Sequence, residues 1–452
     1  MNLKTNLMPH QAIAVKKMLP TRVGALFMDM GTGKTRTAIE IIHHRQKQIS
    51  KIVWFCPVSL KETIKHEITK HTDSKDIYCF DQKTNQRNIN DVFWYVVGIE
   101  SMSLSARVIL TINELIDTDT FVIVDESSYI KGHRSARTNW ITNLSKRAKY
   151  RMILTGTPIS QGVVDLFSQF RFLSPKILGY ASFYSFAANH LEYSEKFPNL
   201  IVRAHNTEWI AAKIKPYVYQ VTKEECLDLP KKLYETRYFS MTNEQREWYE
   251  NVKIEALEYM EEWNSYTIFQ LFSKLQQIVC GFLNAKDIVF THDRVDIMHS
   301  VIDQIKEDEK IIIWCKYEHD INEITKSLGA ENVAQFYGKI NLKNREESIL
   351  DFKNKKRFFL ATESCGGHGL TLNESHYTIF YNNGFKYAER MQAEDRNHRI
   401  GQTKPVTYID IVCEDSIDER IENALQNKGS VVQDFKHEID LIKDKKELIK
   451  QL

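Results

Sequence analysis

Cysteine is scarce in this sequence, and none of it is arranged in closely spaced pairs. The seven cysteines lie far apart along 452 residues, with no C-x-x-C pair among them. Neither a zinc site nor a disulfide framework is therefore indicated, and we expect buried thiols in a reducing, cytoplasmic compartment.

Long apolar runs are missing as well. No stretch approaches the length of a membrane span, and the first residues, MNLKTNLMPHQ, contain no apolar signal core, so we expect no membrane partner. Neither sign of charge predominates, since 61 basic and 59 acidic residues give a formal net charge of +2. This balance neither supports nor excludes a nucleic-acid partner, because a local groove can carry the charge that binding needs.

What the chain does contain is an ordinary globular composition, with 42% hydrophobic and 27% charged residues, at a length that predicts two or three domains. Short apolar runs alternate with amphipathic segments in both halves, a pattern typical of α/β domains with parallel sheets. The alternation breaks from about residue 174 to 284. Aromatic residues recur there at helical spacing, which is more typical of a core than of base-stacking side chains.

The stretch Met28–Thr35, MDMGTGKT, lies between an apolar run and a helical pattern. A glycine-rich turn from a strand into a helix aims backbone N–H groups and the positive end of the helix at one point, which suits a phosphate chain. Lys34 is predicted to reach the β- and γ-phosphates of ATP, and the Thr35 hydroxyl to help hold Mg²⁺. Met28 stands where the strict pattern has glycine, and an ordinary glycine turn is the alternative.

Several neighbouring residues complete a predicted nucleotide-binding set. Gln11 precedes the loop by about 20 residues, and its amide can read an adenine edge because it both donates and accepts. A surface glutamine near a helix start is the ordinary alternative. The full set in this half of the chain is Gln11, Met30, Gly31, Thr32, Gly33, Lys34, Thr35 and Arg36.

Two adjacent carboxylates, Asp125 and Glu126, follow the apolar run FVIV. A strand that delivers such a pair beside a phosphate loop provides one group for Mg²⁺, assigned to Asp125. The other group, Glu126, is assigned to orienting and deprotonating the attacking water. An acidic pair at a strand end can instead cap the next helix.

Other polar residues follow predicted strands, at the edge where open α/β sheets bind ligands. We predict that they contact a ligand or pass the state of the γ-phosphate water to a neighbouring domain, although plain turns made of turn-forming residues are the alternative. These residues are Ser59, Leu60, Lys61, Ser101, Thr155, Thr157 and Thr362.

The second half of the chain contains two further candidate segments. The glycines in TESCGGHGLTL indicate close backbone approach to a ligand, so Gly367 and Gly369 are predicted nucleotide contacts, with a flexible loop as the alternative. The string QAEDRNHRIGQ, residues 392–402, carries Gln392, Arg396 and Arg399. If the string is helical, the two arginines share a face and can clamp a γ-phosphate; a solvated charge pair is the alternative.

These motifs carry a resemblance to a known family. In chain order, LMPHQ, MDMGTGKT, CPVSL, VDESS and LTGTP resemble the first RecA-like domain of superfamily 2 helicases. CPVSLKETIKHE and LTGTPISQGVVDLFSQFRFLSP are similar to Swi/Snf-type DNA translocases, and QAEDRNHRIGQ is nearly identical to the motif that ends their second motor domain. Its QAEDR form resembles the annealing and fork-remodelling branch. One departure is Ser128, where the family usually has histidine.

The resemblance implies an α/β fold of two tandem RecA-like parallel-sheet domains with a helical insertion. The implied boundaries are 1–200 for the ATP-binding motor domain, 201–285 for the insertion, and 286–452 for the second motor domain with its C-terminal helices. A compact phage or bacterial form is the expectation, placed inside a bacterial or phage-infected cell.

The implied function is an ATPase that needs Mg²⁺ and couples hydrolysis to movement on duplex DNA. Remodelling of branched DNA, by branch migration or fork regression, with little dependence on sequence, is the expected task. Its catalytic residues are Lys34, Asp125, Glu126, Arg396 and Arg399. The resemblance also implies that the strand-end set, Ser59, Leu60, Lys61, Ser101, Thr155, Thr157 and Thr362, links the nucleotide to the DNA track. A conventional helicase that separates DNA or RNA strands is one alternative, and a non-motor phosphate-loop protein is another.

Overall fold

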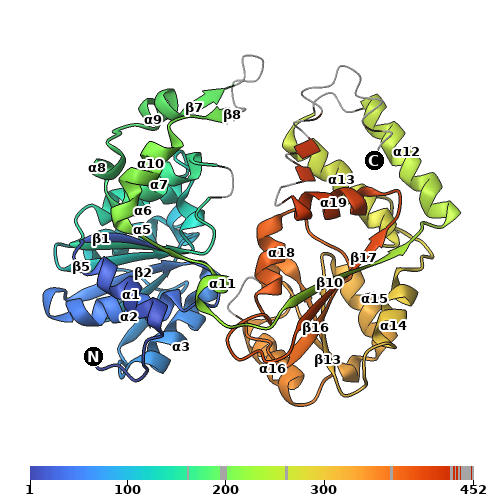
Figure 1. Cartoon of the computed structure of the whole chain (residues 1–452), viewed down its shortest axis with the longest axis horizontal. Coiled ribbons are helices and arrows are strands. Elements are labelled where there is room, and N and C mark those ends of the chain that lie inside the picture. Colours follow the sequence, from blue (N-terminus) through green and yellow to red (C-terminus); the bar gives the residue numbers. More distant parts are fainter. Residues whose placement is uncertain are drawn as a thin grey trace. The chain divides into compact units, whose positions relative to one another are not determined.

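The computed structural model describes residues 1–159, 162–193, 201–259, 263–366 and 370–427, together with 431, 432, 434, 435, 438, 449 and 452. The chain divides into two compact units, Met1–Asp228 and Leu229–Leu452 (Figure 1). Among the described helices, none is long and apolar enough to cross a membrane. All seven cysteines are free, and most of them are buried, as expected.

The first unit is built on a seven-stranded sheet in which every neighbouring pair of strands is parallel. In sheet order the strands are β3 (Ile77–Cys79), β4 (Trp94–Gly98), β2 (Lys51–Cys56), β5 (Thr120–Asp125), β6 (Tyr150–Thr155), β1 (Val23–Met28) and β9 (Val218–Val221). The central strands are almost continuously apolar because helices cover both faces of the sheet.

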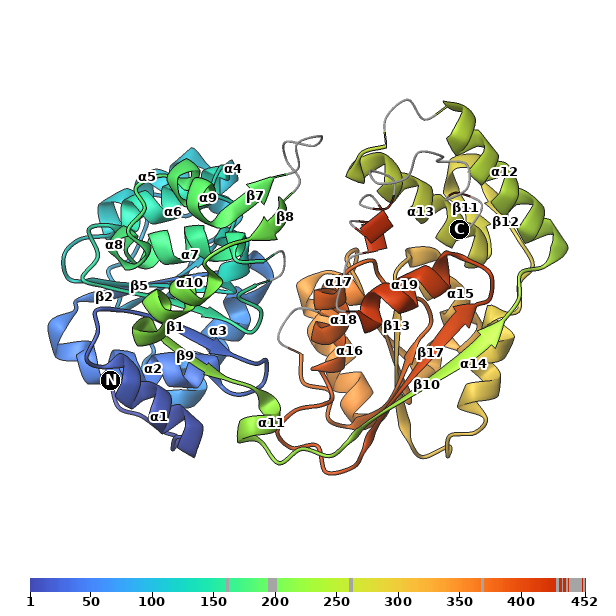
Figure 2. The same cartoon turned by 45° about the horizontal axis from the view of Figure 1, so that its top comes forward.

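Two hydrophobic clusters lie on the two faces of this sheet. Alternate residues of one strand join opposite clusters, as Leu26 and Phe27 do in β1. One face packs against α1 (Pro9–Met18), α2 (Lys34–Arg45) and α3 (Lys61–His71). The other packs against α4 (Ser101–Leu104), α5 (Ala106–Leu115), α6 (Ala136–Ser145) and α7 (Val164–Leu173), which gives three layers (Figures 1 and 2).

The second unit repeats this architecture with a six-stranded parallel sheet. In sheet order its strands are β10 (Lys232–Phe239), β17 (Val406–Cys413), β16 (Ser375–Phe380), β13 (Lys310–Cys315), β15 (Phe358–Thr362) and β14 (Val333–Phe336). One face carries α12 (Asn243–Tyr259), α13 (Ser265–Val279), α14 (Arg294–Ile302), α15 (Glu318–Leu328) and α19 (Ile417–Gln426). The other carries α16 (Leu342–Asn354), α17 (Glu363–Gly366) and α18 (Tyr387–Glu394). The prediction of an α/β protein with two parallel-sheet units is confirmed.

The middle of the chain is more strand-rich than its sequence pattern indicates. It contains α8 (Pro175–Leu178), α9 (Phe183–His190), α10 (Thr207–Ile214), α11 (Lys223–Cys226) and two short antiparallel pairs, β7 (Leu191–Tyr193) with β8 (Ile201–Ala204) and β11 (Phe282–Leu283) with β12 (Ile288–Val289). We did not predict β9, which pairs with β1 and completes the first sheet. Its four residues are too few to give a periodic signal in the sequence, so its pairing with β1 depends on tertiary packing.

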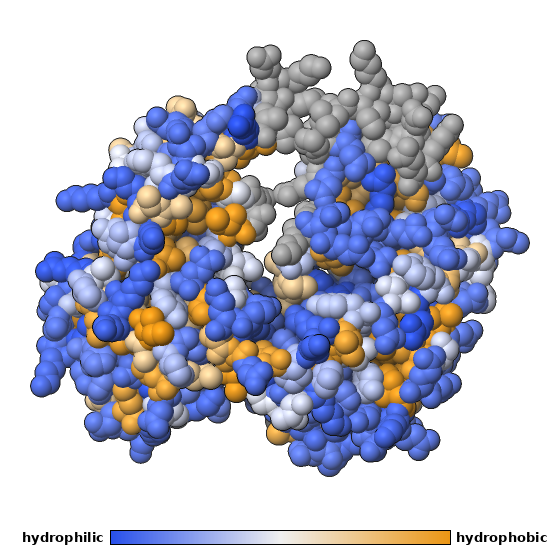
Figure 3. Space-filling view, in the orientation of Figure 1, coloured by the Kyte–Doolittle hydropathy of each residue, from blue (hydrophilic) through white to orange (hydrophobic). Residues whose placement is uncertain are grey.

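The aromatic residues of this middle segment behave in two ways. Phe186, Tyr249 and Phe272 are buried, in line with a core function, whereas Tyr184 and Tyr266 are exposed. On the face of the molecule in Figure 3, hydrophobic residues are scattered among hydrophilic ones. That distribution is the normal surface of a protein whose large apolar side chains pack inside its units.

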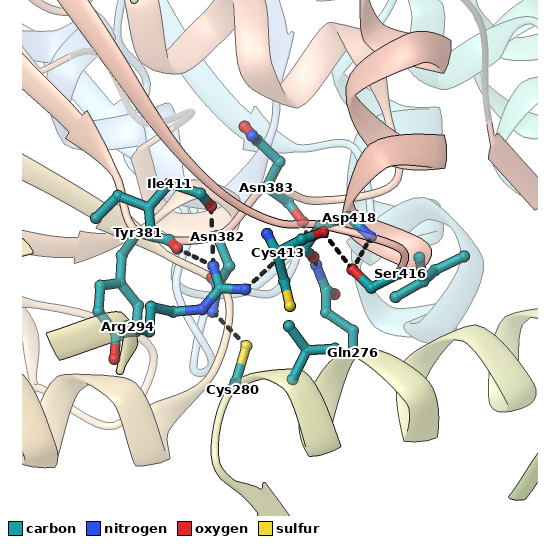
Figure 4. A network of polar contacts seen from close by, with 12 residues as sticks. Gln276, Cys280, Arg294, Tyr381, Asn382, Asn383, Ile411, Cys413, Ser416 and Asp418 are labelled. Carbon is teal, nitrogen blue, oxygen red and sulfur yellow. Dashed lines mark hydrogen bonds and ion pairs between the residues drawn. The ribbon is translucent and has the colours of Figure 1, made fainter. Parts of the chain in front are cut away.

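A buried polar network fastens the helices of the second unit to its sheet (Figure 4). The Arg294 side chain is fully buried; it donates to the carbonyl oxygens of Tyr381 and Ile411 and forms an ion pair with Asp418. Asp418 also accepts a hydrogen bond from the Cys413 N–H. Burial by itself lowers the pKa of Arg294, but the charge of Asp418 is the main neighbour that raises it above its usual value. The guanidinium stays charged, and Asp418 is the partner that compensates this buried charge.

Replacing Asp418 by alanine should destabilise the second unit strongly. The substitution leaves Arg294 charged in a dry site, and breaking a buried pair from one side costs about 3–5 kcal/mol. The matched control is Glu235→Ala, which removes the partly exposed Glu235–Arg237 pair of 2.7 Å and should cost less than about 1 kcal/mol. Native-state hydrogen exchange of β16 and β17 measures both losses, and equal losses would contradict the prediction.

Candidate functional site

Three neighbouring strands of the first unit end together at one edge of the sheet. Strand β6 lies between β5 and β1, with Asp125 paired to Leu154 and Phe27 paired to Thr155. Because the strands are parallel, the residues after them share the carboxyl edge, where open α/β sheets bind ligands. This edge therefore gathers the phosphate loop, the acidic pair and the Thr-Gly-Thr turn, which lie far apart in the sequence.

The phosphate loop has the backbone that its glycines predict. Gly31 and Gly33 have φ angles of +80° and +87°, a region in which a side chain is strained. A Cβ atom on Gly33 would also lie 2.2 Å from the Gln11 Nε2 atom. Gly33 is followed directly by α2, so the loop opens onto a helix N-terminus as a phosphate site requires.

The Lys34 amine lies over the loop. Its Nζ donates to the carbonyl oxygens of Met28, at 2.9 Å, and Asp29, at 3.3 Å. These are contacts that an ammonium group can exchange for phosphate oxygens, so the residues present fit a nucleotide phosphate chain. Thr35, one residue further, is half-buried at the start of α2.

Gln11 of the predicted nucleotide set and its neighbour His10 both hydrogen-bond to the phosphate loop. Gln11 is 4% exposed; its Nε2 donates to the Thr32 carbonyl at 3.0 Å, and its Oε1 accepts from the Met8 N–H at 3.0 Å. His10, which we did not single out, also donates to the Thr32 carbonyl, at 2.7 Å. An adenine contact by Gln11 therefore stays a prediction, and it would require one of these amide bonds to be exchanged.

Arg36 lies in α2 and binds the N-terminal segment of the chain. Its guanidinium donates to the Thr5 carbonyl at 2.6 Å and to the Thr5 hydroxyl at 2.8 Å, and it pairs with Glu40 at 2.7 Å. These contacts give Arg36 a structural role in the first unit. Its predicted contact with nucleotide stays a prediction, as does that of Met30, whose backbone borders Gly156.

Asp125 ends β5 and is 7% exposed. Burial, together with the charge of Glu126 and against the opposing charge of Lys34, raises the pKa of its carboxyl to about 6. A buried carboxylate with little compensation favours a nearby cation. The chemistry of this group, together with the Thr35 hydroxyl, therefore fits Mg²⁺.

Glu126 has an unusual backbone. Its φ of +53° lies in the left-handed region, where a residue with a Cβ is strained. Its Oε1 atom accepts two hydrogen bonds, from the Ser128 hydroxyl and from the Thr155 hydroxyl, both at 3.1 Å. The Thr157 N–H in turn donates to the Thr155 hydroxyl at 3.1 Å. Ser128, which stands where the resembled family usually has histidine, thus binds Glu126, the carboxylate that is predicted to orient the attacking water.

A further link within the site was not predicted. Gln169 of α7 accepts from the Ser127 hydroxyl at 2.6 Å and donates to the Pro158 carbonyl at 2.8 Å. It therefore ties the acidic segment to the turn after β6. The signal in the sequence is a glutamine within the largely apolar helix VDLFSQFRFL, and that signal does not identify its partners.

The other predicted coupling residues of the first unit also follow its strands. Ser59 and Leu60 lie in a short 3₁₀ helix after β2, and Lys61 begins α3, with its Nζ bonded to the Phe80 carbonyl. Ser101 begins α4, shortly after β4. All therefore lie at the same carboxyl edge as the phosphate loop, and their contact with DNA stays a prediction.

In the second unit, Gln392 lies in α18 and Thr362 ends β15. Arg396 and Arg399 are not on a helix face: α18 ends at Glu394, and both arginines lie in the turns that follow. The condition of a helix, under which the two arginines would share a face, is therefore not met, because three-residue spacing is equally compatible with a turn. Arg396 is buried, and Arg399 donates to the Leu370 carbonyl at 2.8 Å. Gly367 and Gly369 lie outside the described residues.

Together, the parallel sheet, the phosphate loop and the acidic pair define an α/β phosphate-loop protein. The SNF2-related domain profile matches residues 10–283, and that of the helicase conserved C-terminal domain matches residues 293–401. The first match covers more than half of the sequence, so the chain belongs to the SNF2-related family.

Individual relatives are distant. An uncharacterized ATP-dependent helicase of Mycoplasma genitalium is 26% identical over 427 residues, which are 90% of this chain and 40% of the relative. The human SWI/SNF-related matrix-associated actin-dependent regulator of chromatin subfamily A member 1 is 23% identical over 437 residues, with 88% and 40% covered. The chain thus spans about two fifths of the length of these curated relatives.

A solved structure, the Sulfolobus solfataricus SWI2/SNF2 ATPase core in complex with dsDNA, is also similar. It is 24% identical, with a TM-score of 0.47, and the alignment covers 100% of this chain and 97% of that one.

Asp125→Asn should stabilise the ligand-free protein above pH 6. The pKa of Asp125 is higher in the folded state than in the unfolded state. The free energy of unfolding of the wild-type protein therefore falls as pH rises from about 4 to about 6. Asparagine does not titrate, so its variant avoids this loss. At pH 7.5 the free energy of unfolding of Asp125→Asn should exceed that of the wild type by up to roughly 3 kcal/mol, and at pH 4 the difference should vanish.

The control for this prediction is Asp119→Asn, at an exposed position just before β5, which should change stability by less than about 0.5 kcal/mol. Hydrogen exchange of β5 and β6, measured across pH, tests both variants. A gain for Asp125→Asn that is the same at pH 4 and pH 7.5 would contradict the assigned cause.

Ser128→Ala should slow ATP hydrolysis without weakening ATP binding. The variant removes one of the two hydroxyls that orient the Glu126 carboxylate, and Thr155 alone remains. We expect kcat to fall about threefold to tenfold, or roughly 0.7–1.4 kcal/mol, with KM for ATP unchanged. Ser128→Thr keeps the hydroxyl and should restore kcat. An unchanged kcat in Ser128→Ala would show that Thr155 suffices.

Proposed function

We propose that this chain is an ATP-dependent DNA translocase that couples ATP hydrolysis to movement along duplex DNA. The observation that carries the proposal is the meeting of Lys34, Asp125 and Glu126 at one sheet edge, joined to the Thr155 turn through hydrogen bonds. Membership of the SNF2-related family and the helicase name of the bacterial relative support it.

Hydrolysis follows from the chemistry of the first unit. Lys34 exchanges its carbonyl partners for the β- and γ-phosphate oxygens, and the backbone N–H groups of residues 31–35 bind the phosphate chain. Thr35 and Asp125 would hold Mg²⁺, which neutralises phosphate charge when bound. Glu126 takes the proton of the attacking water through Oε2, because Ser128 and Thr155 already bind Oε1.

Arg396 and Arg399 are proposed to act on the γ-phosphate during hydrolysis. Guanidinium groups stay ionised and stabilise the charge that develops on the transferred phosphoryl group. Both lie in turns whose backbone is held: the Arg396 carbonyl accepts from the Leu372 N–H at 2.8 Å, and the Arg399 carbonyl accepts from the Gln402 N–H at 3.0 Å.

In this proposal the helices within residues 201–285 act as the insertion, while β9 and β10 of the same range belong to the two sheets. Gln392, Gly367 and Gly369 contact nucleotide.

The substrate is proposed to be branched duplex DNA. The residues at the strand ends of the first unit, Ser59 to Lys61, Ser101 and Thr157, and Thr362 in the second unit, would contact the DNA backbone. Phosphate contacts make such binding tolerant of sequence and sensitive to salt. The QAEDR form of the second motif supports branch migration and fork regression as the task.

The proposal is tested by ATPase assays with linear duplex, single-stranded, forked and four-way DNA and with RNA. Duplex and branched DNA should stimulate hydrolysis most. Lys34→Ala and Glu126→Gln should each lower kcat by at least about a hundredfold, since they remove phosphate binding and the general base respectively. Glu126→Gln should still bind ATP, and Arg399→Ala should lose DNA-stimulated turnover.

The matched control is Arg237→Ala, at a half-exposed arginine of β10 outside the proposed site, which should hydrolyse ATP normally. Stimulation by RNA alone would favour a conventional RNA helicase. Full DNA-stimulated hydrolysis by Arg399→Ala would exclude the proposed role of the arginine pair at the γ-phosphate. Normal hydrolysis by Glu126→Gln would exclude Glu126 as the general base.

A further inference from the structure

The connection between the two units starts at the phosphate loop. Asp29, the first residue after β1, accepts a hydrogen bond from the Lys223 N–H at its Oδ2 atom, at 3.0 Å, and donates its own N–H to the Val221 carbonyl at 3.1 Å. Its carbonyl oxygen accepts from the Thr32 hydroxyl at 2.7 Å and from Lys34 at 3.3 Å. One residue thus contacts both the phosphate-binding lysine and the beginning of α11.

Helix α11 is short but firmly closed. Thr222 and Glu225 form a reciprocal capping box: the Glu225 N–H donates to the threonine hydroxyl at 3.3 Å, and the Thr222 N–H donates to the glutamate carboxylate at 2.8 Å. Lys223 itself is buried. The start of the connection is therefore held to the phosphate loop by the Asp29–Lys223 hydrogen bond and is fixed internally by its capping box.

The other end of the connection is attached to the segment that carries the arginine pair. The Pro230 carbonyl accepts a hydrogen bond from His398 Nε2 at 2.8 Å, and His398 lies between Arg396 and Arg399 in the sequence. The next residue is attached as well, since the Val406 N–H of β17 donates to the Lys231 carbonyl at 3.0 Å.

Glu394 provides a second attachment at this end. Its Oε2 atom binds both the Lys232 amine and the Tyr234 hydroxyl of β10, each at 2.9 Å, and the residue is 1% exposed. Its Oε1 atom accepts from Arg390 at 3.0 Å, and Arg390 forms an ion pair with Asp410 of β17. Removing Glu394 would leave the buried charge of Arg390 with one fewer partner, so this attachment depends on an intact polar network.

We propose that residues 222–232 form a connecting strap that makes the position of the Arg396–Arg399 segment depend on the state of the phosphate loop. Asp29 is the positioning residue at one end, and His398 and Glu394 are the positioning residues at the other. Only residues 224–229 separate the two attachments, and part of this stretch is helical. This inference rests on the proposed function, to which it adds a route of coupling within the chain itself.

The physical argument concerns what phosphate binding changes. Lys34 must leave the carbonyls of Met28 and Asp29 to reach a phosphate, so the contacts of Asp29 change when nucleotide binds. The Asp29 carboxylate passes that change to Lys223 and α11. A short, capped segment transmits displacement, whereas a long flexible linker would absorb it. A passive connector, the alternative, would need neither attachment.

A lengthened strap separates these possibilities. We would insert Gly-Ser-Gly-Ser between Asp228 and Leu229, which lie outside the proposed nucleotide and DNA sites. The control carries the same insertion between Glu307 and Asp308, in an exposed turn of the second unit. Hydrogen–deuterium exchange of residues 387–402 is measured in the full chain, with and without a non-hydrolysable ATP analogue and Mg²⁺, and the analogue's affinity is measured by calorimetry.

In the wild type and the control, the analogue should reduce exchange in residues 387–402. In the lengthened strap the analogue should bind with unchanged affinity, but this reduction should disappear, and DNA-stimulated kcat should fall at least about fivefold because the arginines are no longer positioned. A reduction that persists in the lengthened strap, or is absent from the wild type, overturns the proposal.

A second pair of variants tests the attachment without changing chain length. His398→Ala removes the hydrogen bond to Pro230 and should weaken the exchange effect, whereas His398→Gln places an amide donor near the same position and should restore it. Equal effects of the two variants overturn the assignment of His398. The proposed function is tested separately: it is contradicted if duplex DNA fails to stimulate the wild-type ATPase. In that case the exchange measurement still shows whether the strap couples the phosphate loop to residues 387–402.

Discussion

The parallel pairing of β5, β6 and β1 is the constraint on which the site depends. It brings Asp125, Thr155 and the phosphate loop to one edge, with neighbouring residues of the three strands in register. Almost every side chain in these strands is buried between two helical layers, so a slip of one residue would move apolar groups to the wrong face. Packing of the core therefore also positions the chemistry.

The site keeps several arrangements that lower stability. Asp125 is a buried carboxylate beside a second one, Glu126 has a left-handed backbone, and Gly33 fits only because it lacks a side chain against Gln11. Each is an unfavourable feature that the surrounding structure tolerates. Such features are expected where a cation and a polyanion bind, since the ligand supplies the missing partners.

In the second unit, buried charge connects helices to each other and to the sheet. Arg294 and Asp418 join α14 to α19, while Arg390, Asp410 and Glu394 join α18 to β17 and β10. These pairs contribute little net stability compared with apolar residues of the same size, but they specify one arrangement. The proposed connecting strap resembles them in this respect, because directional polar contacts hold both of its ends.

The sequence by itself determined the class of fold, the phosphate loop and the acidic pair, because each depends on local pattern. Strong apolar runs followed by Gly-Lys-Thr or Asp-Glu are recognisable within eight residues, and the run FVIV lies within β5. Local spacing could not decide the conformation at Arg396 and Arg399, since a turn and a helix can both place two arginines three residues apart.

Only the tertiary structure decided which distant residues touch. The partners of Glu126 are Ser128, two residues away, and Thr155, in another strand; Gln169 joins two motifs from a helix that no motif includes. Strand β9 pairs with β1 in the first sheet, and this pairing brings Lys223 into hydrogen-bond contact with Asp29. Such contacts depend on chain segments brought together by packing, and hydrophobic periodicity carries no information about them.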